Sequence, residues 1–331
     1  MKRPLVSFII PLYNCEKYIE RCINSILSAE VDRKLFEIIV VDDGSRDGGY
    51  MICDSMRTDG YELRLIRQKN QGASAARNAG LELAKGDYIW FVDGDDYVST
   101  TGVCDIFDYI QQFRPEVVCF NYDEETSEGI RTNALYHKLE KWESLEFLGH
   151  HRGLYLWNKV YSRSLIGDHR FLHGTKNIED FLFNIEVLAN AACVECLPLH
   201  GYVYVTTNMS STSRNLSCRN LVKLSQDSLT VHRKIHELIG DTTDIRARRA
   251  LARILNFSIG GHIFSLLKFY NLSYLLKAVR TYRSDRLFPV GTTGNAKMNL
   301  FVGVMNPVLF MAYTVSGLFS KKHERDAVNG K

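Results

Sequence analysis

Apolar and polar residues alternate in blocks along residues 1–120. The runs LVSFII, FEIIVVD and DYIWFVD are apolar at successive positions, which indicates strands covered on both faces. The segments between them, such as EKYIERCINSIL, carry apolar residues three or four positions apart and predict helices. This alternation predicts an α/β fold with a doubly wound, mostly parallel sheet.

Polar and glycine residues follow the predicted strands. In doubly wound sheets, ligands bind beyond the carboxyl ends of the strands, which all meet at one edge. We therefore expect one cleft there, lined by the residues at the strand ends: Pro11, Tyr13, Asn14, Asp42, Asp43, Gly44, Asn70, Asp93, Gly94 and Asp95.

The rest of the chain changes character twice. Residues 121–215 mix helical and strand-like segments, and the chain from 216 onward reads as helices, so we expect a domain over 1–215 and a helical region over 216–331. Residues 298–320 contain no charge and are followed by KKHER. Three interpretations stay open for this stretch: a helix pair at a membrane interface, a soluble cap, or a membrane span.

Composition narrows the class of protein. With 331 residues, 45% of them hydrophobic, the chain has enough apolar residues for a large core. A net charge of +3 without a sustained Lys/Arg run argues against a nucleic-acid partner. The first apolar run is too short for a secretory leader, and eight scattered cysteines suit a reducing compartment, so we expect a protein that is not secreted. Cys193 and Cys196 form a lone CxxC, which we interpret as buried thiols.

Three carboxylates and one glycine follow the strand YIWFV. Asp93 and Asp95 lie one residue apart and cannot both be ionised cheaply without a cation. Carboxylate oxygens favour a hard divalent ion, Mn²⁺ or Mg²⁺, which keeps open positions for a diphosphate. The alternative is that Asp95 and Asp96 cap the following turn or helix.

Two further features could contact a nucleotide. Asp42 and Asp43 end the second strand before Gly44, where a carboxylate can accept a hydrogen bond from a pyrimidine N–H or cap a helix. Arg77 lies on a predicted helix of small residues, GASAARNAGLELAKG, which can lie close to a sheet, and it could reach phosphate. A salt bridge from Arg77 to Asp42 or Asp93 is the alternative.

Five motifs in order resemble one known family. VSFIIPLYNCEKYIERCINSIL, EIIVVDDGSRDG, NQGASAARNAGLELAKGDYIWFVDGDDYV, LWNKVYSRSLI and NIEDFLFNIEVL are similar to the family 2 glycosyltransferases of GT-A fold, over residues 4 to about 213. The resemblance implies that Pro11, Tyr13 and Asp43 surround the base with Asp42 beside them. It also implies that Asn70 and Arg77 line the nucleotide or sugar. The DxD is then Asp93, Gly94 and Asp95, with Asp95 the more direct metal ligand.

Asp180 matches the position of the family's catalytic base. An inverting transfer needs a carboxylate that takes the acceptor proton, on a segment separate from the metal ligands. Glu179 is the second candidate, and the alternative for Asp180 is a helix N-cap. Trp157 and Lys159 could contact sugar or acceptor phosphate, or Trp157 could be buried. Ser210, Ser211, Ser213 and Arg214 could form a lid over the diphosphate.

Other nucleotide enzymes lack support in the sequence. GxGxxG and GxxxxGK[ST] are absent, as is the glycine-rich basic loop of nucleotidyltransferases. The resemblance implies an inverting transfer from a UDP-sugar to a lipid-linked glycan or surface polysaccharide, by a cytoplasmic enzyme peripheral to the inner face of a bacterial membrane. Two alternatives remain: a polyprenyl-phosphate glycosyltransferase and a catalytically silent nucleotide-sugar-binding protein. Slow release of UDP that requires the metal would distinguish an enzyme from a silent protein.

Overall fold

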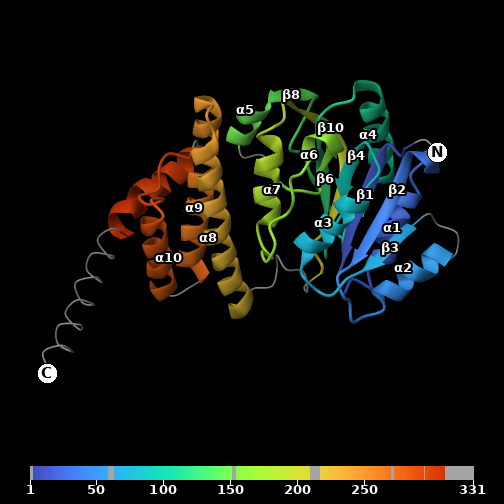
Figure 1. Cartoon of the computed structure of the whole chain (residues 1–331), viewed down its shortest axis with the longest axis horizontal. Helices are drawn as coiled ribbons and strands as arrows, with labels where there is room; N and C mark the ends of the chain where they lie inside the picture. Colours follow the sequence, from blue (N-terminus) through green and yellow to red (C-terminus); the bar gives the residue numbers. More distant parts are fainter. Residues whose placement is uncertain are drawn as a thin grey trace, which may run out of the picture. The chain divides into compact units, whose positions relative to one another are not determined.

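A computed structural model describes residues 3–58, 63–150, 154–208, 217–269, 272–293 and 295–309. The chain divides into two compact units, Met1–Asn220 and Leu221–Lys331. The first is an α/β unit and the second is helical (Figure 1).

One sheet organises the α/β unit. Its strands follow the order β3-β2-β1-β4-β9-β6-β10-β5, with β7 paired to β6 and β8 to β10. The bounds are β1 Val6–Leu12, β2 Phe36–Asp42, β3 Leu63–Arg67, β4 Tyr88–Phe91, β5 Tyr97–Val98, β6 Val117–Thr126, β7 Gly129–Asn133, β8 Glu140–Glu143, β9 Lys159–Ser162 and β10 Cys193–Val205.

The sheet is parallel in its first half and mixed beyond it. The pairs β2–β3, β1–β2 and β1–β4 are parallel, which places the carboxyl ends of these strands at one edge as predicted. β9 lies antiparallel between β4 and β6, and β10 then runs parallel to β6. The antiparallel strand comes from the segment NKVYS, whose four paired residues are too few to show a strand period in the sequence.

Helices cover both faces of the sheet. Figure 1 shows α1 and α2 on one side of it and α7 on the other. The helices of this unit are α1 Ile19–Leu27, α2 Gly49–Thr58, α3 Ala73–Leu83, α4 Thr100–Phe113, α5 Ser144–Gly149, α6 Arg163–Ile166 and α7 Glu179–Leu188, with a 3₁₀ turn at Arg33–Leu35.

The two covered faces explain why the strands are apolar at successive positions. On one face, the ring of Phe8 lies 5.2 Å from Trp90 and 6.2 Å from Phe107 of α4, between ring centroids. On the other, Phe91 packs edge-on against Phe183 of α7 at 5.7 Å. Adjacent residues of β4 therefore enter two separate cores.

The small residues of α3 let that helix approach the sheet, as predicted. A Cβ added at Gly80 would lie 2.4 Å from Cγ2 of Ile9, closer than any side chain can be accommodated. α3 therefore lies directly against β1, and Arg77 lies on the same helix one turn before Gly80.

The helical unit consists of α8 Cys218–Asp241, α9 Ile245–Phe269, α10 Leu272–Ser284 and a further helix over 296–309. The apolar stretch 298–320 lies only partly in that last helix, because residues 310–320 fall outside the described residues. Among the described residues, one helix, Ile245–Lys268, is long and apolar enough to cross a membrane by length and composition alone; its most apolar 18 residues have a mean hydropathy of 1.3, and 44% of them are buried.

A chain of hydrogen bonds runs through the core of the helical unit. The hydroxyl of Tyr282 on α10 lies 2.7 Å from Nδ1 of His232 on α8 and 2.5 Å from Nδ1 of His262 on α9. The outer Nε2 atoms bond to Ser258 and Ser225. Burial lowers the pKa of both histidines, that of His262 to about 4, so the network is uncharged at neutral pH.

Candidate active site

Asp43 fixes the loop that precedes α3. Its side chain is buried, and Oδ1 accepts hydrogen bonds from Nε2 of Gln68 and the N–H of Gln71, both at 2.8 Å. Oδ2 accepts from the N–H of Gly72 at 2.7 Å. The carboxylate that the sequence assigned to the pyrimidine thus also shapes the loop carrying Asn70, which is exposed at the same edge.

Asp42 is fully buried. Its Oδ1 accepts from the N–H of Ser45 at 2.9 Å, and its Oδ2 forms an ion pair with Nε of Arg67, also at 2.9 Å. Asp42 therefore supports the turn after β2 and offers no surface to a ligand. Arg67, the last residue of β3, is a further cation at this edge. It was not among the residues predicted from the sequence, although it ends a strand as they do.

Tyr13 and Asn14 extend the edge beyond Pro11, which is half-buried. The ring of Tyr13 is 45% exposed and is available for stacking. Asn14 adopts a positive φ of 53°, and its Oδ1 accepts from the N–H of Arg46 at 2.8 Å. This contact holds the turn after β1 to the turn after β2.

The three carboxylates of the acidic turn after β4, Asp93, Asp95 and Asp96, have different environments. Asp96 is buried and accepts from the hydroxyl of Tyr202 at 2.8 Å and the N–H of Val205 at 2.7 Å. Burial and the neighbouring carboxylates raise its pKa well above the ordinary value. Asp93 and Asp95 remain partly exposed. Asp96 therefore anchors the turn to β10 and leaves the other two at the cleft.

Two contacts shape this turn further. A Cβ at Gly94 would lie 3.0 Å from the carbonyl oxygen of Pro11, so a residue without a side chain lets the turn lie against the end of β1. Oδ2 of Asp95 accepts from Nδ2 of Asn208 at 2.8 Å. Asn208 was not among the residues predicted from the sequence, although it follows the end of β10 as the other site residues follow their strands.

The donor set of the turn fits a hard divalent ion. Asp93 and Asp95 supply carboxylate oxygens alone, the ligands that Mg²⁺ and Mn²⁺ prefer. Within the described ranges, no three His, Cys, Asp or Glu side chains gather into a metal site. A pair of carboxylates suits an ion whose remaining ligands are water and phosphate oxygens.

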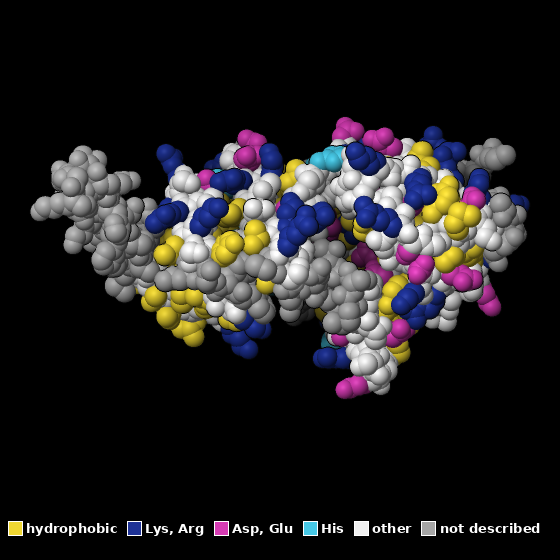
Figure 2. Space-filling model, turned by 90° about the horizontal axis from the view of Figure 1, so that it is seen from below, with side chains coloured by type: hydrophobic (Ala, Val, Ile, Leu, Met, Phe, Trp, Pro, Cys, Tyr) yellow, Lys and Arg dark blue, Asp and Glu magenta, His cyan; other side chains and the backbone are white. Residues whose placement is uncertain are grey.

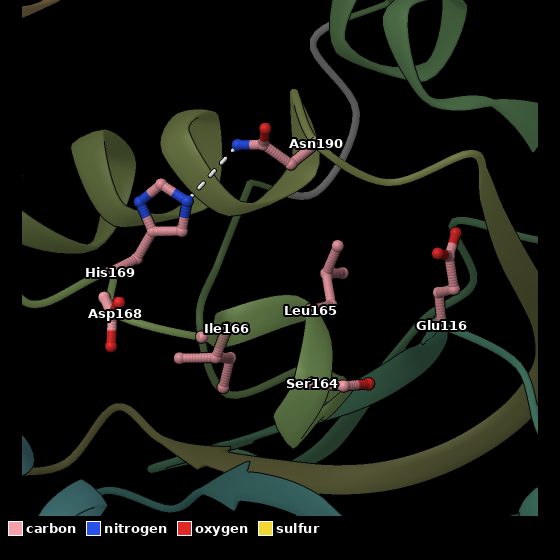
Figure 3. A pocket seen from close by; sticks show the side chains of 8 residues that line it. Glu116, Ser164, Leu165, Ile166, Asp168, His169 and Asn190 are labelled. Carbon is pink, nitrogen blue, oxygen red and sulfur yellow. Dashed lines mark hydrogen bonds between the residues drawn. The ribbon is translucent and has the colours of Figure 1, made fainter.

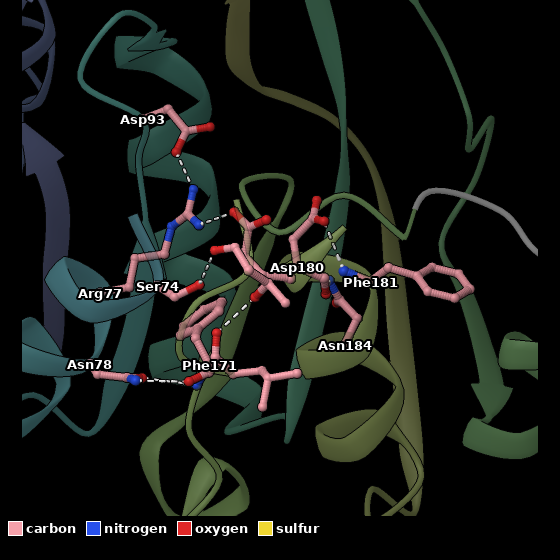
Figure 4. A network of polar contacts seen from close by, with 11 residues as sticks. Ser74, Arg77, Asn78, Asp93, Phe171, Asp180, Phe181 and Asn184 are labelled. Carbon is pink, nitrogen blue, oxygen red and sulfur yellow. Dashed lines mark hydrogen bonds and ion pairs between the residues drawn. The ribbon is translucent and has the colours of Figure 1, made fainter. Parts of the chain in front are cut away.

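Arg77 joins the acidic turn to α7 (Figure 4). Its NH2 lies 2.8 Å from Oδ1 of Asp93, and its NH1 lies 2.9 Å from Oε1 of Glu179. Arg77 is 6% exposed, its guanidinium lies over the ring of Phe171, and the two carboxylates raise its pKa. The salt bridge to Asp93 that the sequence left open is therefore present, and Arg77 is held by protein carboxylates.

α3 also positions the segment that leads into α7. Asn78 exchanges two hydrogen bonds of 2.9 Å with the backbone of Phe171, and Oγ of Ser74 donates to the carbonyl of Thr175 (Figure 4). The N-cap of α7 is Ile178, at a φ of 53° that is strained for a β-branched residue. These contacts fix the direction in which the first turn of α7 enters the cleft.

Asp180 lies in this first turn, which excludes the alternative that it is the N-cap residue. Its Oδ1 accepts from the N–H of Phe181 at 2.8 Å. Burial and the negative charge of Glu179 raise the pKa of Asp180 to about 7, against the opposing charge of Arg77. A carboxylate with a pKa near the working pH is suited to general-base catalysis.

Lys159 is fully buried and donates to the carbonyl of Tyr155 at 2.6 Å and to Oδ1 of Asn158 at 2.8 Å. The prediction that Lys159 contacts an acceptor phosphate is therefore wrong. Trp157 is 8% exposed, with its ring stacked on Tyr202 at 4.6 Å, so of its two interpretations the structure shows burial. The proposed lid residues Ser210, Ser211, Ser213 and Arg214 lie outside the described residues.

Two cavities differ in their relation to this site. One of about 350 Å³ is lined by Asn14 and Asn208, so it adjoins the acidic turn at the carboxyl edge. Another of about 680 Å³ is lined by Glu116, residues 164–169 and Asn190 (Figure 3). Glu116 precedes β6, which places the second cavity at the opposite edge of the sheet. It contains none of the predicted site residues.

Comparisons with known proteins identify the family of the chain and its fold. The family model described as Glycosyl transferase family 2 matches residues 7–173. The chain is 33% identical to the glycosyltransferase EpsJ of Bacillus subtilis over 211 residues, 61% of each protein. It is 28% identical to the poly(ribitol-phosphate) beta-N-acetylglucosaminyltransferase TarS of Staphylococcus aureus over 206 residues, 60% of this chain and 35% of TarS.

The crystal structure of S. aureus TarS 1-349 in complex with UDP-GlcNAc has a TM-score of 0.74 at 20% identity, covering 99% of this chain and 92% of that one. This likeness confirms the predicted fold class, a GT-A sheet followed by a helical region. The match covers about 61% of the length of EpsJ, so family membership does not assign the activity of the whole EpsJ protein to this chain. The residues matched by the family model make up half of the sequence, and the chain therefore belongs to glycosyl transferase family 2.

Proposed function

We propose that this chain is an inverting, metal-dependent glycosyltransferase that moves a sugar from a UDP-sugar to a hydroxyl group of an acceptor glycan. The observation that carries the proposal is the pair of ion pairs made by Arg77. They place the acidic turn of Asp93 and the first turn of α7, 86 residues later in the chain, on one guanidinium group.

Asp180 is the proposed general base. Its carboxylate takes the proton of the acceptor hydroxyl while that oxygen attacks the anomeric carbon of the donor. The pKa of about 7 allows Asp180 to be ionised before the step and to hold the proton after it. Arg77 and Glu179 do not touch the acceptor in this proposal; they position the turn that carries Asp180.

Asp93 and Asp95 are the proposed ligands of Mn²⁺ or Mg²⁺. When bound, the ion supplies positive charge that stabilises the departing diphosphate. The protein contributes rigidity, because Asp93 is held by Arg77 and Asp95 by Asn208. Tyr13 and Asn70, which are exposed, are the proposed surface for the base, with Pro11 and the buried Asp43 as its other proposed contacts.

TarS was crystallised with UDP-GlcNAc, which makes this nucleotide sugar the first donor to test. The proposed acceptor is a lipid-linked glycan or surface polysaccharide at the inner face of a bacterial membrane. This location is supported by the uncharged stretch 298–320 and the basic residues after it.

UDP release by the purified chain, measured over a set of UDP-sugars with Mn²⁺, Mg²⁺ or a chelator, tests the proposal. We expect release with at least one donor and its loss with the chelator. Asp180→Asn should keep donor affinity within about twofold while transfer falls by about a hundredfold or more. Asp95→Ala should remove metal-dependent donor binding.

Asp108→Asn, on the exposed side of α4, is the matched control and should behave as the parent. Unchanged transfer in Asp180→Asn would remove Asp180 from the role of base. Donor binding that is indifferent to metal and to Asp95→Ala would contradict the assignment of the metal site.

A further inference from the structure

The helix over residues 296–309 in the helical unit is apolar on its buried side and also on its exposed side. The buried side carries Val302 and Leu309, which are 5% and 2% exposed. Asn306 exchanges hydrogen bonds of 2.9 and 3.1 Å with the backbone of Val290 and so ties the helix to the segment before it. The exposed side carries Leu300 and Val304. A helix on the surface of a water-soluble protein normally carries polar residues on that side.

The outward residues form a continuous stripe. Leu300, Val304 and Val308 follow one another at four-residue intervals and are 73%, 58% and 46% exposed. At this spacing they lie on one side of the helix. Three aliphatic side chains in line, all turned to solvent, indicate a surface that is covered in use.

The end of α9 extends this surface. Met298 and Val302 pack over Gly260 of α9, and the ring of Phe301 meets Phe264 edge-on at 5.6 Å. Phe264 itself is 53% exposed. Figure 2 shows hydrophobic side chains gathered at one edge of the helical unit with Lys and Arg close by. We call Phe264, Leu267, Leu300, Val304 and Val308 the apolar face.

Charge is divided unequally between the two units. Residues 221–331 contain 17 Lys and Arg against seven Asp and Glu, whereas residues 1–220 contain 24 against 31. The helical unit is therefore strongly basic although the whole chain carries only +3. Lys268 follows Leu267 at the end of α9, and Lys297 is exposed at the start of the last helix.

The sequence continues the same character beyond the described residues. Residues 310–320 contain no charged residue, and KKHER follows directly. An apolar face with basic residues around it is complementary to a bilayer whose headgroups are negatively charged.

We propose that the apolar face docks the protein on an anionic lipid surface. The face enters the region between headgroups and acyl chains, while Lys268, Lys297 and the other basic residues of the helical unit contact lipid phosphates. This inference deepens the membrane location in the proposed function and names the residues that make the contact. It does not depend on the transfer chemistry.

Sedimentation of the full-length protein with vesicles tests the inference. We expect binding to phosphatidylcholine vesicles that contain about 30 mol% phosphatidylglycerol, weaker binding in 1 M salt, and little binding to phosphatidylcholine alone. The combined variant Leu300→Ser, Val304→Ser and Val308→Ser should lower the partition coefficient by about tenfold or more.

A matched control replaces three exposed apolar residues of the α/β unit, Met51, Ile130 and Leu139, by Ser and should bind as the parent. Both variants should release UDP at the parental rate without vesicles, so failure of docking and failure of the enzyme are separable. Equal vesicle binding by the parent and the stripe variant would overturn the inference. Absence of vesicle binding by the parent would also overturn the inference. If the parent then forms a dimer that the triple Ser variant of Leu300, Val304 and Val308 abolishes, the apolar face belongs to a contact with a second copy of the chain.

Discussion

Replacing Glu179 by Gln tests whether the ionisation of Asp180 controls transfer. Glu179 is the nearest negative neighbour in sequence and, after burial, the main reason that the pKa of Asp180 is raised to about 7. The variant removes this repulsion and also frees the charge of Arg77 from its ion pair with Glu179. Both effects favour the ionised form of Asp180, so its pKa should fall.

The size of the fall follows from Coulomb's law. Two like charges about 6 to 10 Å apart at an effective dielectric constant of about 20 repel by roughly 1.7 to 2.8 kcal/mol, or about one to two pKa units. Because Asp180 is partly exposed, we expect a shift of about one unit. At pH 6 its ionised fraction would then rise from about 9% to about 50%.

The assay is the pH dependence of kcat/KM, whose acid limb reports the base of the free enzyme. The parent should lose activity as the pH falls through about 7, and the Glu179→Gln variant should lose it about one unit lower, whatever its maximal rate. Glu82→Gln, on the exposed side of α3, is the matched control and should leave the midpoint in place. A midpoint in Glu179→Gln that stays or moves upward would refute the electrostatic reasoning.

Two further predictions concern stability. Arg77→Met leaves Asp93 and the more deeply buried Glu179 without their shared cation, so it should destabilise the α/β unit by about 3 kcal/mol, the lower end for a broken buried pair. The three tryptophans all lie in that unit, so their fluorescence during urea unfolding measures the loss. An unchanged urea midpoint would contradict the role of the ion pairs. In the helical unit, the buried histidines have pKa values below the unfolded value, so their contribution to stability should be complete above about pH 6.5 and decline as the pH falls toward 4. Hydrogen exchange of α8 and α9 at pH 7 and pH 5 measures this; His262→Gln should weaken the pH dependence and the exposed His236→Gln should not.

The sequence by itself determined the first half of the sheet and the edge at which the site lies. The apolar residues at successive positions of β1, β2 and β4 are buried only if each strand is covered on both faces. This pattern can be recognised in the sequence without knowing which strands pair. The same pattern places Asp43 and Asp93 at the strand ends, because parallel strands share a carboxyl edge. The small residues of α3 likewise predicted its close approach to β1.

Only the tertiary structure decided what those side chains contact. Asp42 and Asp43 have comparable positions in sequence. In the structure, Asp42 is buried in an ion pair with Arg67, whereas Asp43 accepts hydrogen bonds from the loop before α3. Lys159 reads as a cleft residue but enters the core, because β9 is inserted antiparallel between two strands distant in sequence.

The sequence offered Asp93 as one possible partner of Arg77, but only the structure decided for it and revealed Glu179 as the second. The guanidinium meets carboxylates 16 and 102 residues away, and an ion pair depends on distances of about 3 Å that no local pattern encodes. The hydrogen bonds between Asn306 and Val290 are a similar case, because a helix with apolar residues on two sides leaves its orientation open until its neighbours fix it. Local periodicity therefore determined the elements and their edge, and contacts between distant segments decided the site.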